Sequence, residues 1–311
     1  MDPGTRFVNS VVELFTQRPE LDEVFFNGPD VAAFASGHGA GLMSSGVLPP
    51  LNSFFPSTLA VMDWLQDLAA SCSTRLDPMA PSAGGKIPGH SARWHAMFPP
   101  LVRNGPVLCI RKSRLGSLTL GDFHMEVNVR DALRVHLLGG GSLLVSGPTG
   151  SGKSSFIAAV LREFLSGRRM VIIESVEELT GLSDGHVDLV ARPPNLIGAG
   201  EIGVGWLFQE SLRLRPDGIV IGEIRGQEAS AFCGALVSGH RWCLATIHAG
   251  SPREALARLS ILAGDDSARV VAEANLALVQ LSRDRPENEG DRNPRDFGAR
   301  VVGYQSLSGL Q

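Results

Sequence analysis

The sequence predicts an α/β protein of two domains, the larger of which is built around a parallel sheet. Three observations lead to this prediction. The chain has 311 residues, of which 43% are hydrophobic, and this is enough for two cores. Between residues 142 and 247, short apolar runs alternate with segments of helical periodicity, which is the order of strands and helices around a parallel sheet. The glycine-rich stretch 147–154 joins one of these runs to a helical segment.

A smaller α/β domain is predicted to occupy residues 1–111. Periodicity and turn residues predict, in order, a helix over 7–15, strands over 23–26 and 31–34, a helix over 57–72, and strands over 92–98 and 106–111. The long helix is expected to bury one apolar face, formed by Leu59, Met62, Leu65, Leu68, Ala69 and Cys72. Residues 77–90 are rich in Pro, Gly and Ser, and they are expected to form a loop.

Residues 112–122 are the predicted linker, and the second domain is expected to span 123–311. Its expected strands are 143–146, 169–173, 218–221, 242–247, 276–281 and 299–306. Helices are expected between them, including one over 154–165, one that ends near residue 214, and one that begins after Ser251. The charged, polar stretch 283–295 is expected to be a mobile loop.

The stretch 147–154, Gly-Pro-Thr-Gly-Ser-Gly-Lys-Ser, has the pattern and setting of a phosphate-binding P-loop. Its glycines let backbone N–H groups turn inward around a β-phosphate, and the helix that follows adds the positive end of its dipole. Lys153 can reach the β- and γ-phosphates, and the Ser154 hydroxyl can bind Mg²⁺. We therefore expect a bound nucleoside triphosphate, contacted by Gly147, Pro148, Thr149, Gly150, Ser151, Gly152, Lys153, Ser154 and Ser155.

Two further predicted strands of the second domain end in carboxylates. Ligands of open α/β sheets lie at the carboxyl ends of the strands, so these groups are candidates for the same site. Glu174 can bind Mg²⁺ through water, whereas a solvated turn is its alternative, and that alternative has more weight for Glu177 and Glu178 than for Glu174. Glu223 is our first choice for the group that orients the attacking water. Arg225 can clamp phosphate, although a surface ion pair with Glu223 is the alternative.

A third strand ends in His248, and His240 precedes the same strand. A histidine at a strand end can hydrogen-bond the γ-phosphate or relay its presence to a neighbouring loop. A structural role is about equally expected for His248, and His240 is similarly ambiguous.

Composition narrows the function classes. The net charge of −4 argues against extensive binding to nucleic acid, which needs clustered Lys and Arg. The four cysteines form no Cys-x-x-Cys pair, so neither a zinc site nor a disulfide framework is expected. No apolar run is long enough to cross a bilayer, and the N-terminus lacks the layout of a secretory signal. A cytoplasmic protein is therefore expected.

Taken in order, the segments of the second domain resemble the secretion (traffic) ATPase superfamily of type II and type IV secretion systems and type IV pili. The likeness is greatest to the type IV secretion and Tad-pilus branch. The matching pieces are the P-loop 147–154, Ile-Glu at 173–174 with Glu-Glu-Leu at 177–179, Leu-Arg-Leu-Arg-Pro-Asp at 212–217, Gly-Glu-Ile-Arg-Gly at 222–226, Ser-Gly-His at 238–240, and Thr-Ile-His-Ala-Gly-Ser at 246–251.

This resemblance implies a RecA-like ATPase domain behind a smaller, PAS-like N-terminal domain, in a homo-hexamer that binds ATP and Mg²⁺ between the two domains. It matches Glu174 to the acidic box, Glu223 to the Walker B glutamate, and His240 and His248 to the histidine box. It also implies arginine fingers that complete a neighbour's site, for which the candidates are Arg93, Arg103, Arg111 and Arg114. The implied partner is an inner-membrane secretion or pilus platform protein, with peripheral association to that membrane.

The implied function is a motor that hydrolyses ATP to power protein secretion, pilus assembly or conjugative transfer. Two departures from the family pattern leave the turnover rate open: Ser175 stands where the family has Asp, and Trp242-Cys243 stands where it has Gly-Ser. A nucleotide-sensing scaffold with little hydrolysis is therefore the alternative. A transporter ATP-binding subunit and a nucleic-acid motor are disfavoured, the first because its signature-like segment 306–311 lacks a following helix, the second by charge and few aromatics.

Overall fold

The computed structural model describes residues 2–18, 21–30, 32–36, 43–44, 48–113, 118–179, 182–183, 185–192, 194, 199–264, 267–283 and 299–307. The chain divides into two compact units between residues 114 and 115, and each unit is described by itself. The predicted loop 283–295 lies outside the described residues, apart from Arg283 at the end of a strand.

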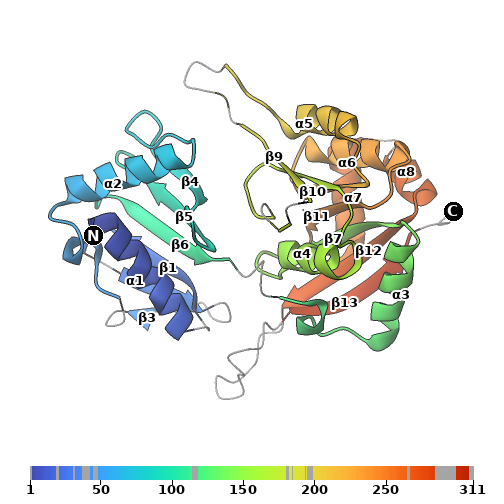
Figure 1. Cartoon of the computed structure of the whole chain (residues 1–311), viewed down its shortest axis with the longest axis horizontal. Helices are drawn as coiled ribbons and strands as arrows, with labels where there is room; N and C mark the ends of the chain where they lie inside the picture. The colour runs from blue at the N-terminus through green and yellow to red at the C-terminus, as the bar shows by residue number, and fades with distance from the viewer. Residues whose placement is uncertain are drawn as a thin grey trace. The chain divides into compact units, whose positions relative to one another are not determined.

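The N-terminal unit consists of a six-stranded antiparallel sheet and two helices, α1 (Pro3–Gln17) and α2 (Thr58–Ser71) (Figure 1). The strands lie in the order β3 (Met43–Ser44), β2 (Ala32–Ser36), β1 (Leu21–Asn27), β6 (Val107–Lys112), β5 (Ala92–Met97) and β4 (Ser82–Lys86). A short 3₁₀-helix, η1 (Leu51–Ser53), precedes α2. Phe7 of α1 anchors the core, since its ring packs edge to face against Phe26, Phe54 and Trp64.

The prediction of a loop over 77–90 is wrong, because residues 82–86 form the edge strand β4. Its two glycines weaken the strand signal, but they let the strand pack closely. A Cβ atom at Gly84 would lie 2.8 Å from the carbonyl oxygen of Trp94, and one at Gly85 would lie 3.0 Å from the Cβ and Sγ atoms of Cys72. The expected helices and the other expected strands of this unit are confirmed, but Leu59 is 66% exposed, because α2 buries Val61, Leu65, Leu68 and Ala69.

The C-terminal unit is built on a seven-stranded sheet that is parallel except for its last pair (Figure 1). The strands lie in the order β13 (Ala299–Ser306), β12 (Leu276–Arg283), β7 (Ser142–Gly147), β11 (Cys243–His248), β10 (Gly218–Ile224), β8 (Met170–Glu174) and β9 (Val187–Val190). The P-loop strand β7 thus has β11 and β10 on one side and β12 and β13 on the other.

Helices cover both faces of this sheet. One apolar cluster joins it to α3 (Val127–Leu138), α4 (Lys153–Phe164) and the 3₁₀-helix η2 (Leu120–Asp122). The other cluster joins it to α5 (Val204–Ser211), α6 (Glu228–Val237), α7 (Pro252–Ala263) and α8 (Ser267–Glu273), with η3 (Leu212–Leu214) after α5. This two-faced cover is what a parallel sheet requires.

The predicted helix start at Ser251 is confirmed, since the Ser251 side chain accepts a hydrogen bond from the Glu254 N–H. Sequence analysis did not predict α3, α8 or β9. In α3 the cause is visible: Val127, Val135 and Leu138 are exposed, so apolar side chains surround the helix and blur its periodicity.

Candidate nucleotide-binding site

The loop 148–152 connects buried β7 to α4, as the sequence predicts. Gly150 and Gly152 have φ of +76° and +89°, a left-handed backbone that glycine adopts without strain. Gly147 is required for a different reason: a Cβ atom there would lie 2.5 Å from Oγ of Ser151 and 2.8 Å from the carbonyl oxygen of Leu281. A larger residue at 147 would therefore displace the loop from the neighbouring strand β12.

Lys153 folds back over its own loop. Its Nζ donates hydrogen bonds to the carbonyl oxygens of Gly147 and Pro148, at 2.9 and 3.0 Å. Burial lowers the pKa of Lys153, while the charges of Glu223 and Glu178 act to raise it. The ammonium group therefore lies among the P-loop carbonyls and two carboxylates, in a position to meet a phosphate.

Glu174, at the end of β8, is only 2% exposed. Each of its oxygens lies 3.0 Å from the backbone N–H groups of Glu178 and Leu179, which donate to the carboxylate. It also packs against Gly222, where a Cβ atom would lie 2.9 Å from Cγ of Glu174. This carboxylate holds the following turn in place.

Glu178, on that turn, contacts the P-loop directly. The Ser154 hydroxyl donates a hydrogen bond of 2.5 Å to its carboxylate. Sequence analysis gave Glu178 a lower rank than Glu174, because its distance along the chain from the strand end hides this contact. The available signal was the position of Glu178 four residues after Glu174, because the turn between them brings the chain back to the site.

Glu223, on β10, forms an ion pair of 2.6 Å with Arg225. This bond raises the pKa of the guanidinium, which stays charged. Glu228, at the start of α6, accepts hydrogen bonds from the backbone N–H of Gly226 at 2.7 Å and from the hydroxyl of Ser175 at 3.0 Å. The residue that departs from the family pattern, Ser175, thus connects the end of β8 to the loop after Glu223.

His248 lies level with Gly147 on the neighbouring strand β11, and the Thr149 hydroxyl lies 3.4 Å from its Nδ1. The predicted meeting of this strand end with the P-loop is thereby present in the structure. His240 lies before β11, and its carbonyl oxygen accepts a bond from the Cys243 thiol. No described contact brings the His240 side chain to the P-loop.

Trp242 occupies the second departure from the family pattern. It has a φ of +53°, which costs energy for a residue with a side chain. Its indole offsets that cost: the ring is 5% exposed, donates through Nε1 to the Leu137 carbonyl at 2.6 Å and stacks under the Arg168 guanidinium.

Gln280 is a buried polar residue that sequence analysis missed. Gln280 lies on β12, where it pairs with Ser146 of β7, and it is 3% exposed. Its Oε1 accepts a 2.5 Å bond from the Ser146 hydroxyl, and its Nε2 donates to the Ala249 carbonyl at 3.3 Å. The amide therefore links the strand before the P-loop to the residue after His248. One polar residue within an apolar strand was the signal that could have found it.

The candidate arginine fingers belong to the N-terminal unit. Arg93 lies on β5 and Arg111 on β6, where Arg111 pairs with Glu23 at 2.9 Å. Arg103 is exposed in the turn before β6, and Arg114 lies outside the described residues. All four stay predictions.

Mg²⁺ needs few protein ligands, because it keeps several waters and binds substrate phosphates. The Ser154 hydroxyl beside the Glu178 carboxylate, with Glu174 one turn away, fits that requirement. Within the described ranges no group of three or more His, Cys, Asp or Glu side chains could hold a metal by itself.

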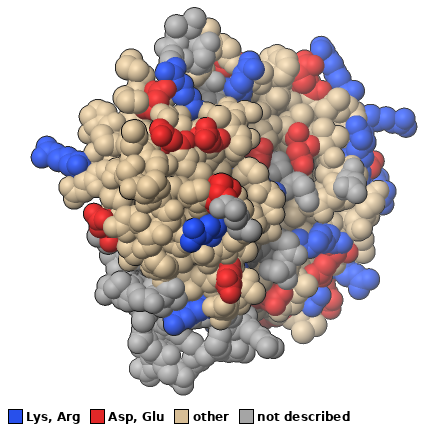
Figure 2. Space-filling view, turned by 60° about the vertical axis from the view of Figure 1, so that its left-hand side comes forward, with Lys and Arg blue, Asp and Glu red and all other residues tan. Residues whose placement is uncertain are grey.

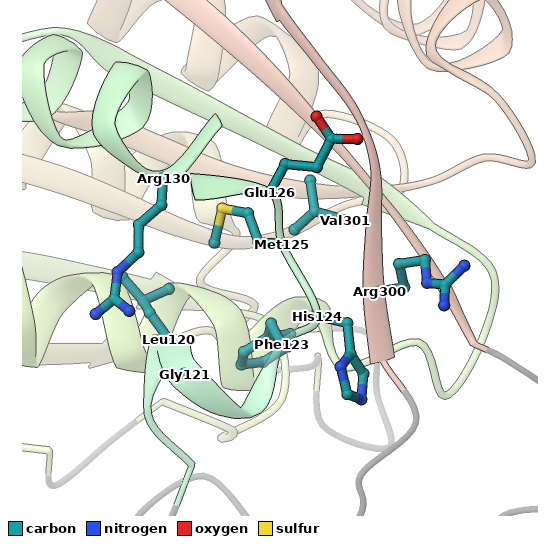
Figure 3. A pocket seen from close by; sticks show the side chains of 9 residues that line it. All are labelled: Leu120, Gly121, Phe123, His124, Met125, Glu126, Arg130, Arg300 and Val301. Carbon is teal, nitrogen blue, oxygen red and sulfur yellow. The ribbon is translucent and has the colours of Figure 1, made fainter. Parts of the chain in front are cut away.

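A separate pocket of about 470 Å³ lies in the same unit (Figure 3). Three segments line it: η2 with the residues up to Met125, the start of α3 with Glu126 and Arg130, and the start of β13 with Arg300 and Val301. Sequence analysis did not predict this pocket.

Surface charge and the apolar character of the helices concern possible nucleic-acid and membrane partners. On the face shown in Figure 2, basic and acidic side chains are interspersed. Among the helices that the structure describes, none has the length and hydropathy needed to span a membrane.

Comparisons with known proteins identify the family. The model of the type II/IV secretion system protein family matches residues 93–285. A putative conjugal transfer protein of Mycobacterium tuberculosis is 34% identical over 250 residues, which cover 74% of this chain and 70% of that protein. Protein VirB11 of Rhizobium radiobacter is 28% identical, over 83% of this chain and 81% of its own length.

Solved structures show the same fold. The ATPase DotB of Legionella pneumophila matches with a TM-score of 0.61 at 16% identity, over 91% of this chain and 78% of that chain. The pilus retraction motor PilT with bound ADP matches with a TM-score of 0.58 at 15% identity, over 88% and 78%. The predicted fold class and the predicted resemblance are both confirmed. The chain belongs to the type II/IV secretion system protein family.

Proposed function

We propose that this protein is an ATPase that powers protein secretion, conjugal transfer or pilus assembly across the bacterial envelope. The observation that carries the proposal is the convergence on one P-loop of Lys153, Glu178, Glu223 and His248, from α4, from the turn after β8, and from the ends of β10 and β11. The relatives named for conjugal transfer and as VirB11 support the transport setting.

The P-loop would bind the phosphates of ATP. Lys153 would exchange its bonds to two loop carbonyls for bonds to the β- and γ-phosphates, next to the N-terminus of α4. Ser154, with Glu178 or Glu174 acting through water, would hold Mg²⁺, which neutralises phosphate charge.

Glu223 would orient the attacking water, the role in which a positioned acid or base contributes about 10²–10⁴-fold in rate. Its ion pair with Arg225 holds the carboxylate at the end of β10, and Arg225 would meet the γ-phosphate from there. His248 would sense the γ-phosphate while it contacts Thr149 of the P-loop. The ends of β10 and β11 would therefore respond to the same bound group.

The assembly is proposed to be a homo-hexamer. An arginine of one subunit's N-terminal unit, among the four candidates, would complete a neighbour's site and stabilise charge in the transition state. An inner-membrane secretion or pilus protein would receive the force, with this protein associated peripherally on the cytoplasmic side. No direct contact with nucleic acid is proposed, given the net charge of −4.

A nucleotide-sensing scaffold with little hydrolysis is the second candidate. The observation that favours it is Ser175, whose hydroxyl donates to Glu228 where the family pattern has a further carboxylate. One negative charge fewer near the metal would weaken Mg²⁺ binding and slow turnover.

Native mass and ATP turnover of the wild type, Lys153→Ala and Glu223→Gln test these proposals. We expect a hexamer, loss of turnover in both variants, and ATP binding retained in Glu223→Gln alone. A monomer or dimer with full activity would contradict the ring motor. Tight ATP binding without turnover, in the presence of the membrane partner, would favour the scaffold.

A further inference from the structure

A side-chain contact between Ser175 and Glu228 joins two strand ends of the C-terminal unit. Ser175 follows Glu174, the last residue of β8, and Glu228 is the first residue of α6, which follows β10. The strands β8 and β10 are neighbours in the sheet (Figure 1). The Ser175 hydroxyl donates a hydrogen bond of 3.0 Å to Oε1 of Glu228. The roles proposed above for hydrolysis make no use of this contact.

The other oxygen of Glu228 holds the loop after β10. Oε2 accepts hydrogen bonds from the backbone N–H groups of Gly226 at 2.7 Å and of Arg225 at 3.4 Å. The pKa of the Arg225 guanidinium is raised mainly by its bond to Glu223, and the nearby charge of Glu228 adds to this effect. One carboxylate therefore bonds to the loop through one oxygen and to the turn after β8 through the other.

Both ends of this link carry groups that are proposed to act on ATP. The loop contains Arg225, which pairs at 2.6 Å with Glu223, two residues earlier in the chain. The turn after β8 carries Glu178, which accepts the hydrogen bond of the Ser154 hydroxyl. Glu228 thus connects the proposed Mg²⁺ side of the site to the side that would orient the attacking water.

Within the described ranges Glu228 bonds to no P-loop residue, so it would act by positioning other groups. A purely structural role is the alternative, because an acidic residue in the first turn stabilises a helix. Glu254, in the first turn of α7, makes the same kind of bond, to the Gly250 N–H at 2.9 Å. Among the residues that the structure describes, its carboxylate has no second partner comparable to Ser175. Glu254 therefore provides a comparison that separates the two roles.

We propose that Glu228 is a positioning residue for hydrolysis, and that from α6 it takes the place of the carboxylate that the family pattern has at position 175. Serine suits position 175 because its hydroxyl donates to Glu228, which an ionised aspartate cannot do. The inference rests on the proposed function, because it assigns a further residue to the same site.

A double-mutant cycle tests the link in the full-length protein, with Ser175→Ala, Glu228→Ala and the two changes combined. We expect each single change to lower kcat for ATP at least about fivefold and to leave KM within about twofold of the wild type. Because both changes break the same contact, the combined variant should be no slower than Glu228→Ala alone. Losses that multiply in the combined variant would overturn the inference.

Two further substitutions at position 175 sharpen the test. Ser175→Thr keeps the hydroxyl, so kcat should stay within about twofold of the wild type. Ser175→Asp matches the family pattern but places a second negative charge beside Glu228, so kcat should fall at least as far as in Ser175→Ala. Faster turnover in Ser175→Asp than in the wild type would contradict the proposed replacement.

Glu254→Ala is the matched control for Glu228→Ala, since it removes a carboxylate from the same place at the start of another helix. Its kcat should stay within about twofold of the wild type. An equal loss of kcat in Glu254→Ala and Glu228→Ala would reduce Glu228 to the stabilisation of a helix start, and the inference would fail.

Amide hydrogen exchange of the segment 222–230 provides a readout that needs no turnover. Ser175→Ala lies outside this segment, so faster exchange there, by about threefold or more, would come from the lost link. Val176→Ala, on the same turn, is the control and should leave the exchange unchanged. Unchanged exchange in Ser175→Ala would overturn the inference, whether or not the wild type hydrolyses ATP. Faster exchange together with a wild type that has no turnover would contradict the proposed function and support the link.

Discussion

The carboxylates at the ends of β8 and β10 lie in opposite environments. Glu174 is 2% exposed, and both its oxygens accept hydrogen bonds from backbone N–H groups. Glu223 is partly exposed and pairs with Arg225, whose side chain is 63% exposed. A strand-end position predicts that a carboxylate lies at the site. It does not predict whether the carboxylate is free to act there or is already used by the fold.

Glu178 completes the contrast. Glu178 lies on the turn that Glu174 holds in place, and its carboxylate accepts the hydrogen bond from the Ser154 hydroxyl. The comparison therefore separates a residue that positions the turn from residues that face the phosphates. Substitutions at these positions test that separation.

Glu223→Gln is expected to lower the rate of ATP turnover by about 10²-fold or more, because an amide cannot serve as the base for the attacking water. Phosphate release measures it. Urea denaturation should show stability within about 0.5 kcal/mol of the wild type, because Glu223 is partly exposed near the carboxyl end of β10. A large loss of stability would remove the distinction from Glu174.

Glu174→Gln is expected to lower the free energy of unfolding by about 2 kcal/mol, because charge-assisted bonds from the buried Leu179 N–H and the part-buried Glu178 N–H become weaker. Urea denaturation measures it. Glu177→Gln, an exposed neighbour on the same turn, is the control and should stay within about 0.5 kcal/mol. Unchanged stability in Glu174→Gln would mean that the buried carboxylate is not a structural anchor.

Gln280→Leu is expected to lower the free energy of unfolding by about 1–2 kcal/mol, since the buried Ser146 hydroxyl loses its 2.5 Å acceptor and keeps only the Val279 carbonyl at 3.4 Å. Because the amide also bonds next to His248, kcat should fall while the KM for ATP changes little. The exposed Gln305→Leu on β13 is the control. A fall in stability with kcat unchanged would limit Gln280 to packing.

The smallest expected effect is a pH dependence. The pKa of Lys153 is lowered in the folded protein, so below that pKa the charged group destabilises the fold relative to a neutral one. Between the lowered pKa and the ordinary value of 10.5, the unfolded chain binds more protons, and stability rises with pH. The stability of the wild type relative to Lys153→Met, from urea denaturation, should increase across that window. A decrease there would contradict the lowered pKa.

Much of the fold follows from local patterns. Buried parallel strands are continuous apolar runs, and the P-loop carries its own backbone requirements at Gly150 and Gly152, so both are visible in the sequence. The strand β4 was not predicted, because the need for its glycines comes from atoms that pack closely against them in the folded unit. The helix α3 was not predicted, because its exposed face is also apolar. In the site, the contacts of Glu178 and Gln280 were not predicted, because their partners, Ser154 and Ser146, lie 24 and 134 residues away in the chain.

The fold-back of Lys153 has a consequence for the end of each cycle. When product leaves, the ammonium has two carbonyl acceptors within its own loop, at Gly147 and Pro148, so an empty site leaves no bare positive charge behind. Departure of ADP is then an exchange of partners rather than a loss of them.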